Sequence, residues 1–580
     1  MADHVRTDAE VLSPPAGARR GLIIAVVALG VAMVTLDGTI VGVALPTIIA
    51  DVGLDFTQAQ WVFCVYSIVV AVLLIVLTRL GDRFGRRAIL GLGVVVFVGG
   101  SALAASADTP SPLIWGRFVQ GLGAAAVLAG SLSTVAAVFR GRDRAVAFTV
   151  WGVALATGAV AGALLGGWFT DSFTWPWIFL INIPIGVVVL VGTLLAIPET
   201  RIGTQASGVD VDGWLLATAG FALVVYALIE AQHYGWGPPR REFTVIGTTW
   251  SMRASTSPMP LVLVVGVLLL VLFVFWERHR VKVEHAALVD FSRVRDPRRW
   301  GDAAMFLVSL AQFGVLFALP LYLVNSLGLS TLRTGFVLAG LTGAALVAGL
   351  MSIGSARPLH PVWRVRVGLA IAVITIAVTA FALTATTSVW VPAILLACYG
   401  IGIGLATPPL TGRLSVAAPA AASDASSAIT LTARHAGAAL GVAVLGGALS
   451  IALGHFLPDR LATVRGLVPR AADTVTEATR DSAGGAITGL RNQHAPAAVT
   501  DALAAGFADA TRVALLSAAV VLLFALLAST RIPMELDRAP EPVGGPGPED
   551  GQPPGTAAGA VTGDTQTRAG EAIRSDPGLT

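Results

Sequence analysis

The sequence of 580 residues has few charged side chains, two cysteines and a single lysine, and each shortage excludes a class of protein. Only 13% of the residues are charged, which is too few for a soluble protein of this length. Cys64 and Cys398 lie far apart within apolar runs, a spacing that suits neither a disulfide framework nor a metal site. We therefore expect both cysteines to be packing residues.

The sequence also lacks the features of an ATP-driven transporter, an enzyme or a nucleic-acid-binding protein. The single lysine, Lys282, is not part of a Gly-x-x-x-x-Gly-Lys-Ser/Thr phosphate loop, and no catalytic or nucleotide-binding domain is evident. The net charge of +3 reflects arginines that flank apolar runs, where anionic lipid headgroups are the nearer partner. We expect no ATP, no nucleic acid, no metal and no cofactor.

Hydrophobic side chains make up 55% of the sequence, and they gather in long runs. An α-helix needs about 20 residues to cross the hydrocarbon core of a bilayer, and most of the runs have this length. A membrane β-barrel would instead show short alternating segments. The first run is too long for the apolar part of a signal peptide. These features predict an all-α polytopic membrane protein.

Fourteen membrane spans are predicted, at residues 22–45, 60–78, 88–106, 113–137, 146–168, 178–198, 213–231, 260–276, 302–324, 335–354, 366–385, 389–411, 426–452 and 510–530. Arginines cluster in every second loop, for example at Arg83 and Arg140, whereas the loops at 46–59, 107–112 and 169–177 have neither lysine nor arginine. Because positive charge collects in cytoplasmic loops, we expect both termini in the cytoplasm of a cell-membrane protein.

The spans divide into two halves of six with an inserted pair, a plan known from transporters that bind substrate between the halves. The expected domains are a cytoplasmic tail at 1–20, a six-helix half at 21–200, an inserted pair with a basic loop at 201–300, a second half at 301–530 with an outer loop at 455–508, and a disordered cytoplasmic tail at 531–580. The outer loop at 232–259 has a β-prone stretch that could form a hairpin, and 455–508 should hold short helices.

Asp37 is the first candidate site residue, because it is an acid inside an apolar run. A carboxylate in the membrane is costly, so it usually faces the bundle interior and marks an ion or substrate pathway. The alternative is that Asp37 only pairs with a neighbouring helix. Arg117 in span four needs a partner as well, and counting residues places it at a depth comparable with Asp37. The alternative is that Arg117 lies at the membrane interface and its side chain extends outward to the headgroups.

Two further patterns concern motion. The loop after span two holds Asp82, Arg83, Gly85, Arg86 and Arg87, in which glycine permits a tight reversal and the acid can pair with an arginine. This loop either latches the two halves together or only anchors the chain at the headgroups. Span five has small residues at a close spacing, which form a flat face for another helix. Its glycines are Gly158, Gly162, Gly166 and Gly167.

The loop resembles the signature Gly-x-Leu-x-Asp-Arg-x-Gly-Arg-Arg of the major facilitator superfamily, with Thr78 at the first glycine position. The span-four run Arg-x-x-Gln-Gly-x-Gly-Ala-Ala, which includes Gln120, resembles the motif in which this family assigns the arginine to proton coupling. Span five resembles the antiporter motif of its exporters, with Ala163 in place of the proline. The runs at 36–46, 174–186, 319–330 and 433–446 resemble the fourteen-span drug:proton antiporter (DHA2, EmrB/QacA-like) family.

The resemblance implies a secondary transporter that exports drugs or other amphipathic hydrophobic compounds, with the proton gradient as its energy source. Asp37 and Arg117 would couple protons to transport. A dedicated exporter of one lipid or secondary metabolite is the rival within transport, and a transport-inactive scaffold or sensor is the rival outside it. The expected partners are the lipid bilayer, protons and a small amphipathic substrate. Possible cavity-lining residues are Gln120, Gln312, Tyr322, Asn325 and Arg434.

Overall fold

The computed structural model describes residues 17–201, 210–245, 247–283, 288–289, 298–354, 360–416 and 420–532. Within these residues, 14 helical segments are long and apolar enough to cross a membrane, which confirms the predicted number. Residues 1–16 and 533–580 of the predicted tails at 1–20 and 531–580 lie outside the described residues, as does part of the basic loop, including Arg293 and Arg295.

The first group of helices comprises α1 (Gly17–Val52), α2 (Phe56–Phe84), α3 (Arg86–Ala105), α4 (Pro110–Val138), α5 (Gly141–Ser172), α6 (Trp177–Leu180) and α7 (Asn182–Ala196). A pair follows, α8 (Val211–Tyr234) and α9 (Met259–Lys282), joined through strands β1 (Phe243–Val245) and β2 (Thr248–Trp250). The second group comprises α10 (Arg298–Leu321), the π-helix η2 (Tyr322–Ser326), α11 (Thr331–Gly354), α12 (Pro361–Ala382), α13 (Trp390–Val416), α14 (Ala420–Leu461), α15 (Pro469–Asp481), α16 (Gly485–Asn492) and α17 (Ala497–Ser529).

Local sequence signals explain where several helices begin and end. The Asp55 side chain accepts a hydrogen bond from the Gln58 backbone, and the Gln58 side chain binds back to Asp55, so that a capping box starts α2. Gly85 has a φ of 114° between α2 and α3, a conformation that side chains with a Cβ rarely adopt. The tight reversal predicted for this loop is thereby confirmed.

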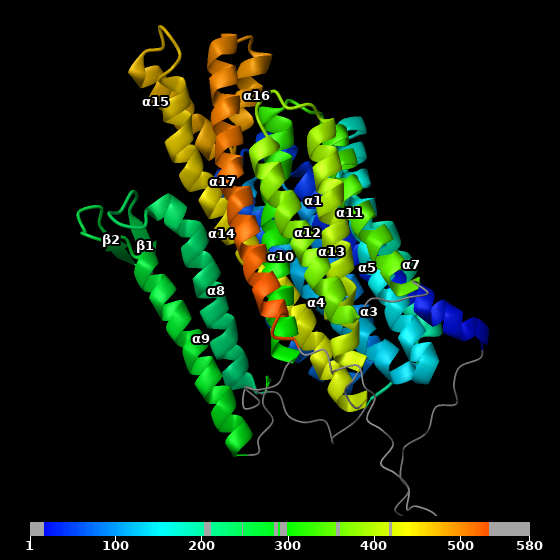
Figure 1. Cartoon of the computed structure of the whole chain (residues 1–580). Coiled ribbons are helices and arrows are strands. Elements are labelled where there is room, and N and C mark those ends of the chain that lie inside the picture. The colour runs from blue at the N-terminus through cyan, green and yellow to red at the C-terminus, as the bar shows by residue number, and fades with distance from the viewer. Residues whose placement is uncertain are drawn as a thin grey trace, which may run out of the picture. The chain divides into compact units, whose positions relative to one another are not determined.

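Glycines bring neighbouring helices into backbone contact within each group. A Cβ added at Gly123 of α4 would meet the Phe97 backbone of α3, and one at Gly441 of α14 would meet Leu310 of α10. In lipid, such close approach replaces the hydrophobic effect as the source of helix association. The helix pairs α3–α4 and α10–α14 are therefore held by van der Waals contact along their lengths (Figure 1).

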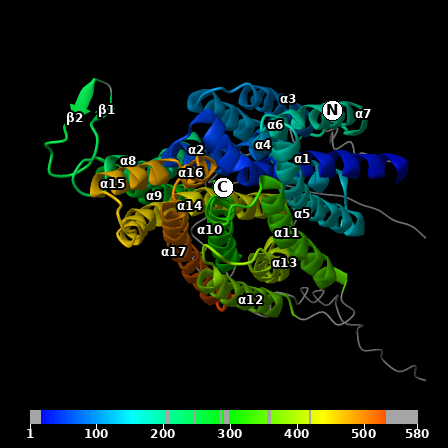
Figure 2. The same cartoon turned by 90° about the horizontal axis from the view of Figure 1, so that it is seen from above.

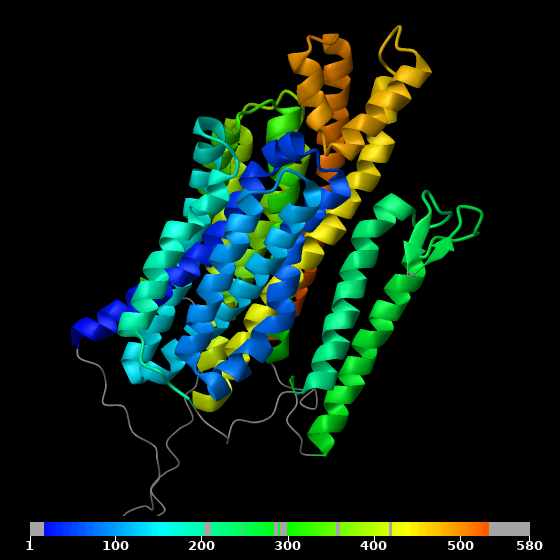
Figure 3. The same ribbon diagram turned by 180° about the vertical axis from the view of Figure 1, so that it is seen from behind.

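The α8–α9 pair packs on itself and on the flank formed by α2 and α14 (Figures 1 and 3). Trp214 of α8 donates its indole N–H to the Val72 carbonyl of α2 at 2.9 Å. The antiparallel pairing of β1 with β2 forms the hairpin predicted between these two helices. The most apolar window of α9 is only 11% buried, so most of this stretch is left for lipid to cover.

The segment at 455–508 contains more helix than the predicted outer loop. The short helices predicted there are present as α15 and α16, but α14 continues to Leu461 and α17 already begins at Ala497. Both helices are longer than the predicted spans because their polar ends keep helical backbone bonds beyond the apolar run. At the other extreme of the chain, α1 extends from Gly17 to Val52 and includes Pro46.

Among the described residues, hydrogen bonds between the first and second groups lie toward the end of the bundle opposite the α2–α3 loop. We call this end the distal end and the α2–α3 side the basic end; Figure 2 views the helices along their axes. The Gln60 side chain donates to the Val442 carbonyl at 2.9 Å, and the hydroxyls of Thr47 and Thr331 lie 3.3 Å apart. Asp171 accepts a hydrogen bond from the Leu332 backbone at 3.0 Å.

Candidate functional site

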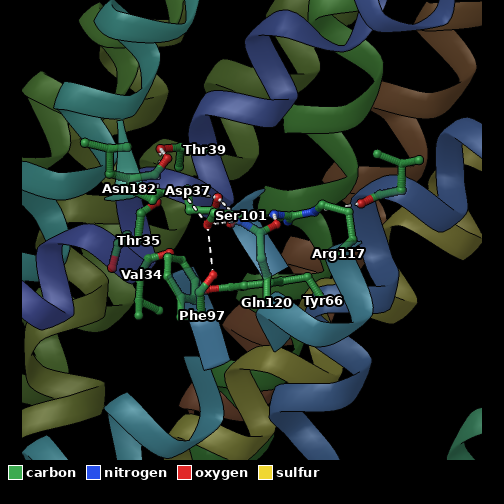
Figure 4. A network of polar contacts seen from close by, with 12 residues as sticks. Val34, Thr35, Asp37, Thr39, Tyr66, Phe97, Ser101, Arg117, Gln120 and Asn182 are labelled. Carbon is green, nitrogen blue, oxygen red and sulfur yellow. Dashed lines mark hydrogen bonds and ion pairs between the residues drawn. The ribbon is translucent and has the colours of Figure 1, made fainter. Parts of the chain in front are cut away.

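Asp37 is fully buried in the middle of α1, where side chains from α4 and α7 donate to it (Figure 4). Its Oδ2 accepts from the Arg117 guanidinium at 2.5 Å. Its Oδ1 accepts from the Gln120 and Asn182 side-chain amides, each at 2.8 Å. The carboxylate therefore has one charged and two neutral donors, as a buried ion in lipid requires.

Arg117 is 1% exposed and uses its guanidinium to join α1, α2 and α4. Besides the bond to Asp37, Nη1 donates to the Gln120 side chain at 2.7 Å and Nε donates to the Val62 carbonyl at 3.2 Å. The guanidinium carbon lies 4.6 Å from the centre of the Tyr66 ring, a cation–π contact. Arg117 thus lies inside the bundle and not at an interface.

Two members of this network, Ser101 and Asn182, are not predicted as site residues from the sequence. The Ser101 hydroxyl donates to the Phe97 carbonyl and accepts from the Gln120 and Asn182 amides at 2.8 and 3.2 Å. Asn182 was quoted only within the run at 174–186. An amide or hydroxyl inside an apolar run is a weak signal, because such residues also satisfy ordinary helix contacts.

The network is charge-balanced as long as Asp37 is ionised and Arg117 is protonated. Protonation of Asp37 would leave the guanidinium without a counter-charge in a place that water does not reach. Removing one partner of a buried ion pair costs about 3–5 kcal/mol. The site therefore holds a permanent cation in direct contact with an ionisable acid, and this pair stabilises the packing of α1 against α4.

At the basic end, Asp82 accepts two hydrogen bonds from the Arg86 guanidinium, at 3.0 and 2.7 Å. This ion pair spans one helical turn and connects the end of α2 to the start of α3. The Arg83 side chain is exposed, and that of Arg87 is half-buried. The pairing predicted for Asp82 is present, and the function of this loop as a latch between the halves stays a prediction.

The glycines of α5 contact two different helices. A Cβ at Gly158, Gly162 or Gly166 would meet the α1 backbone, at Ala32, Leu36 or Ile40 respectively. A Cβ at Gly167 would instead meet Thr331 and Leu332 of α11, in the second group. Ala163 leaves α5 continuous from Gly141 to Ser172. A role of this helix in antiport stays a prediction.

The remaining predicted residues lie in the second group. Tyr322 donates to the Thr384 carbonyl at 2.7 Å, and Asn325 donates to the Ala483 carbonyl at 3.0 Å. Gln312 and Arg434 are half-buried. A cavity of about 10 Å³, room for at most one water molecule, lies between the groups, and none of these four residues lines it. Their contribution to a substrate cavity stays a prediction.

The helical bundle and its buried carboxylate–guanidinium network define a polytopic α-helical membrane protein with a charged site at its centre. The sequence of residues 27–442 matches the family described as the Major Facilitator Superfamily, and the chain belongs to that family. It is therefore a membrane transporter and not an enzyme.

Relatives of known role support this assignment. The chain is 31% identical to the puromycin resistance protein pur8 of Streptomyces alboniger, over 75% of this chain and 84% of that protein. It is 28% identical to the tetracenomycin C resistance and export protein of Streptomyces glaucescens, over 79% and 80%. The fold is similar to that of a bacterial homologue of the human lysosomal transporter Spinster in an inward-facing, unoccupied conformation. That comparison has a TM-score of 0.56 and 16% identity, and covers 91% of this chain and 100% of the other.

Proposed function

We propose that this transporter exports drugs or other amphipathic hydrophobic compounds in exchange for protons. The names of its relatives, which concern resistance to puromycin and export of tetracenomycin C, support export of such compounds. The observation that carries proton coupling is the buried pair of Asp37 and Arg117, because it is an ionisable site at the centre of the first helix group.

In the proposed cycle, a proton binds to Asp37 and removes the charge that holds Arg117. The hydrogen bond from the guanidinium loses its charge assistance, while Oδ1 can still accept from the Gln120 and Asn182 amides, and α1 shifts relative to α4. Release of the proton restores the ion pair and the original packing. Inward proton flow through these two states would drive substrate outward by alternating access.

We further propose that the basic end faces the cytoplasm. Arg83, Arg87 and Arg140 belong to connections at this end, and cytoplasmic loops carry the excess of positive charge. In this orientation the described contacts between the helix groups, such as those of Gln60 and Thr47, close the outer side. Both termini would then lie in the cytoplasm of a cell-membrane protein.

The test is uptake of a fluorescent lipophilic compound into inside-out vesicles, with and without an imposed proton gradient. We expect the native chain to accumulate the compound only with the gradient, and Asp37→Asn to abolish this accumulation. Asparagine keeps the size and one acceptor of the side chain but cannot carry the negative charge or exchange the proton.

The matched control is Asp51→Asn, which removes an exposed acid from the end of the same helix. It should leave gradient-driven uptake unchanged. Unchanged uptake by a well-inserted Asp37→Asn variant would assign coupling to another residue. Uptake of many unrelated compounds would favour a multidrug exporter over a dedicated one.

A further inference from the structure

Arg434 is a half-buried arginine in α14. Its helix contacts α2, α4 and α8 on one side and α10, α13 and α17 on the others. Among the described residues, no acid forms an ion pair or hydrogen bond with its guanidinium, in contrast to Arg117. A buried cation in the membrane needs a counter-charge, and here the described part of the chain does not supply one.

Helix geometry places this guanidinium beside the interface between the two helix groups. Leu431 packs in the core of the first group, and the Val442 carbonyl binds Gln60 of α2, so that one face of α14 looks toward that group. At 100° per residue, His435 lies in the middle of this face, and Arg434 lies between it and the face that packs on α10.

The depth of Arg434 is close to that of the Asp37 network. Tyr66 of α2 donates to the Val34 carbonyl of α1, six residues below Gln60 along α2. Gln60 is hydrogen-bonded to the Val442 carbonyl, so these two residues lie at the same depth. The position on α14 at the depth of Tyr66 is therefore about six residues from Val442 toward the basic end, within one turn of Arg434. The two sites therefore lie at a similar depth, one in each helix group.

Other polar groups near Arg434 also lack a partner within the described structure. They are the His435 Nδ1 and the Ser309 hydroxyl. Ser309 of α10 is 1% exposed and lies against Gly437, one turn from Arg434 along α14. Asp302, nearer to the basic end, accepts from Thr430 instead. The region thus offers one permanent cation and two groups able to donate hydrogen bonds to an anion.

We infer that Arg434, with His435 and Ser309 beside it, binds the acidic group of an amphipathic substrate, such as a carboxylate or phenolate. The inference rests on the proposed export function and names the substrate class. Asp37 is already neutralised by Arg117, so an anion entering between the helix groups meets the charge of Arg434, which no acid among the described residues compensates, and is not repelled by the Asp37 carboxylate. The apolar body of the substrate would lie against the surrounding apolar helices.

The experiment measures binding of pyrenebutanoate and of its uncharged counterpart pyrenebutanol to the full chain in lipid nanodiscs, by energy transfer from the tryptophans. We expect the native protein to prefer the acid. Arg434→Gln should weaken binding of the acid by about tenfold or more and that of the alcohol by less than about twofold, because charge-assisted hydrogen bonds are lost only with the acid. Arg434→Lys should keep part of the preference.

Arg333→Gln, which removes an exposed arginine of α11, is the matched control and should change neither affinity. No preference in the native protein, an unchanged affinity of Arg434→Gln for the acid, or equal loss for both compounds would overturn the inference. Gradient-driven uptake of pyrenebutanol by the native protein tests the proposed function separately. Its failure, with the acid preference intact, would refute export and leave the binding site standing.

Discussion

At the residue scale, the environment of the Asp37 carboxylate is set by the three side chains that donate hydrogen bonds to it. Arg117 and Gln120 come from one helix and Asn182 from another, and each contributes one bond of 2.5 to 2.8 Å. Because all are buried, no water can replace a donor that is removed. The stability of the first helix group should therefore depend on each donor.

Asn182→Leu tests this dependence, because it keeps the approximate size of the side chain and deletes the amide. We expect the free energy of unfolding to fall by about 1–3 kcal/mol, the range for a buried group that loses a hydrogen bond. The measurement is the apparent melting temperature of the detergent-solubilised protein. Asn492→Leu, at the exposed end of α16, should change it little. Equal shifts in both variants would contradict a structural role of the Asn182 amide.

At the element scale, the packing of α5 on α1 depends on residues without a Cβ. An added Cβ at Gly162 would meet Leu36 and Ile40 backbone atoms and the Thr39 hydroxyl, none of which can move aside at low cost. Gly152, in the same helix, has no atom within 4 Å of the corresponding position. Alanine substitutions at these two glycines therefore separate the effect of helix propensity on stability from that of close packing.

Gly162→Ala should destabilise the protein by about 1–3 kcal/mol through overpacking of α1 against α5. Gly152→Ala should be neutral or stabilising by up to about 1 kcal/mol, because alanine is the better helix former. Denaturation in mixed micelles of both variants and of the native chain gives the comparison. The packing argument fails if Gly162→Ala is as stable as Gly152→Ala.

At the scale of the whole molecule, transport requires the two helix groups to separate at the distal end. The hydroxyls of Thr47 in α1 and Thr331 in α11 lie 3.3 Å apart there, so the described conformation is closed at this end. Alternating access predicts that this contact breaks in every cycle. A covalent bond across it should hold the transporter in one state.

The variant Thr47→Cys/Thr331→Cys, made with Cys64→Ala and Cys398→Ala, tests this requirement. Oxidation should abolish gradient-driven uptake, and a reducing agent should restore it. The control is the pair Thr244→Cys/Thr249→Cys, which joins β1 to β2 within one hairpin. The hydroxyls of these two threonines lie 3.2 Å apart. Oxidation of this pair should leave uptake intact. Full uptake by a chain with the Thr47–Thr331 bridge formed would contradict separation at this place.

The sequence by itself determined the membrane class, the number of spans and the two charged residues at the centre. These features follow from local physics, because backbone in lipid must form helices of a minimum length and a charge there needs a partner. The reversal at Gly85 followed in the same way from the conformational freedom of glycine.

Only the tertiary structure decided which groups complete the site. Asn182 donates to Asp37 across 145 positions of the sequence and to Ser101 across 81, and no local pattern reports such contacts. The same holds for the α5 glycines, which divide between α1 and α11, and for the lack of an acid beside Arg434 among the described residues. Partner choice depends on how whole helices cross, and crossing is fixed by packing summed over their full lengths.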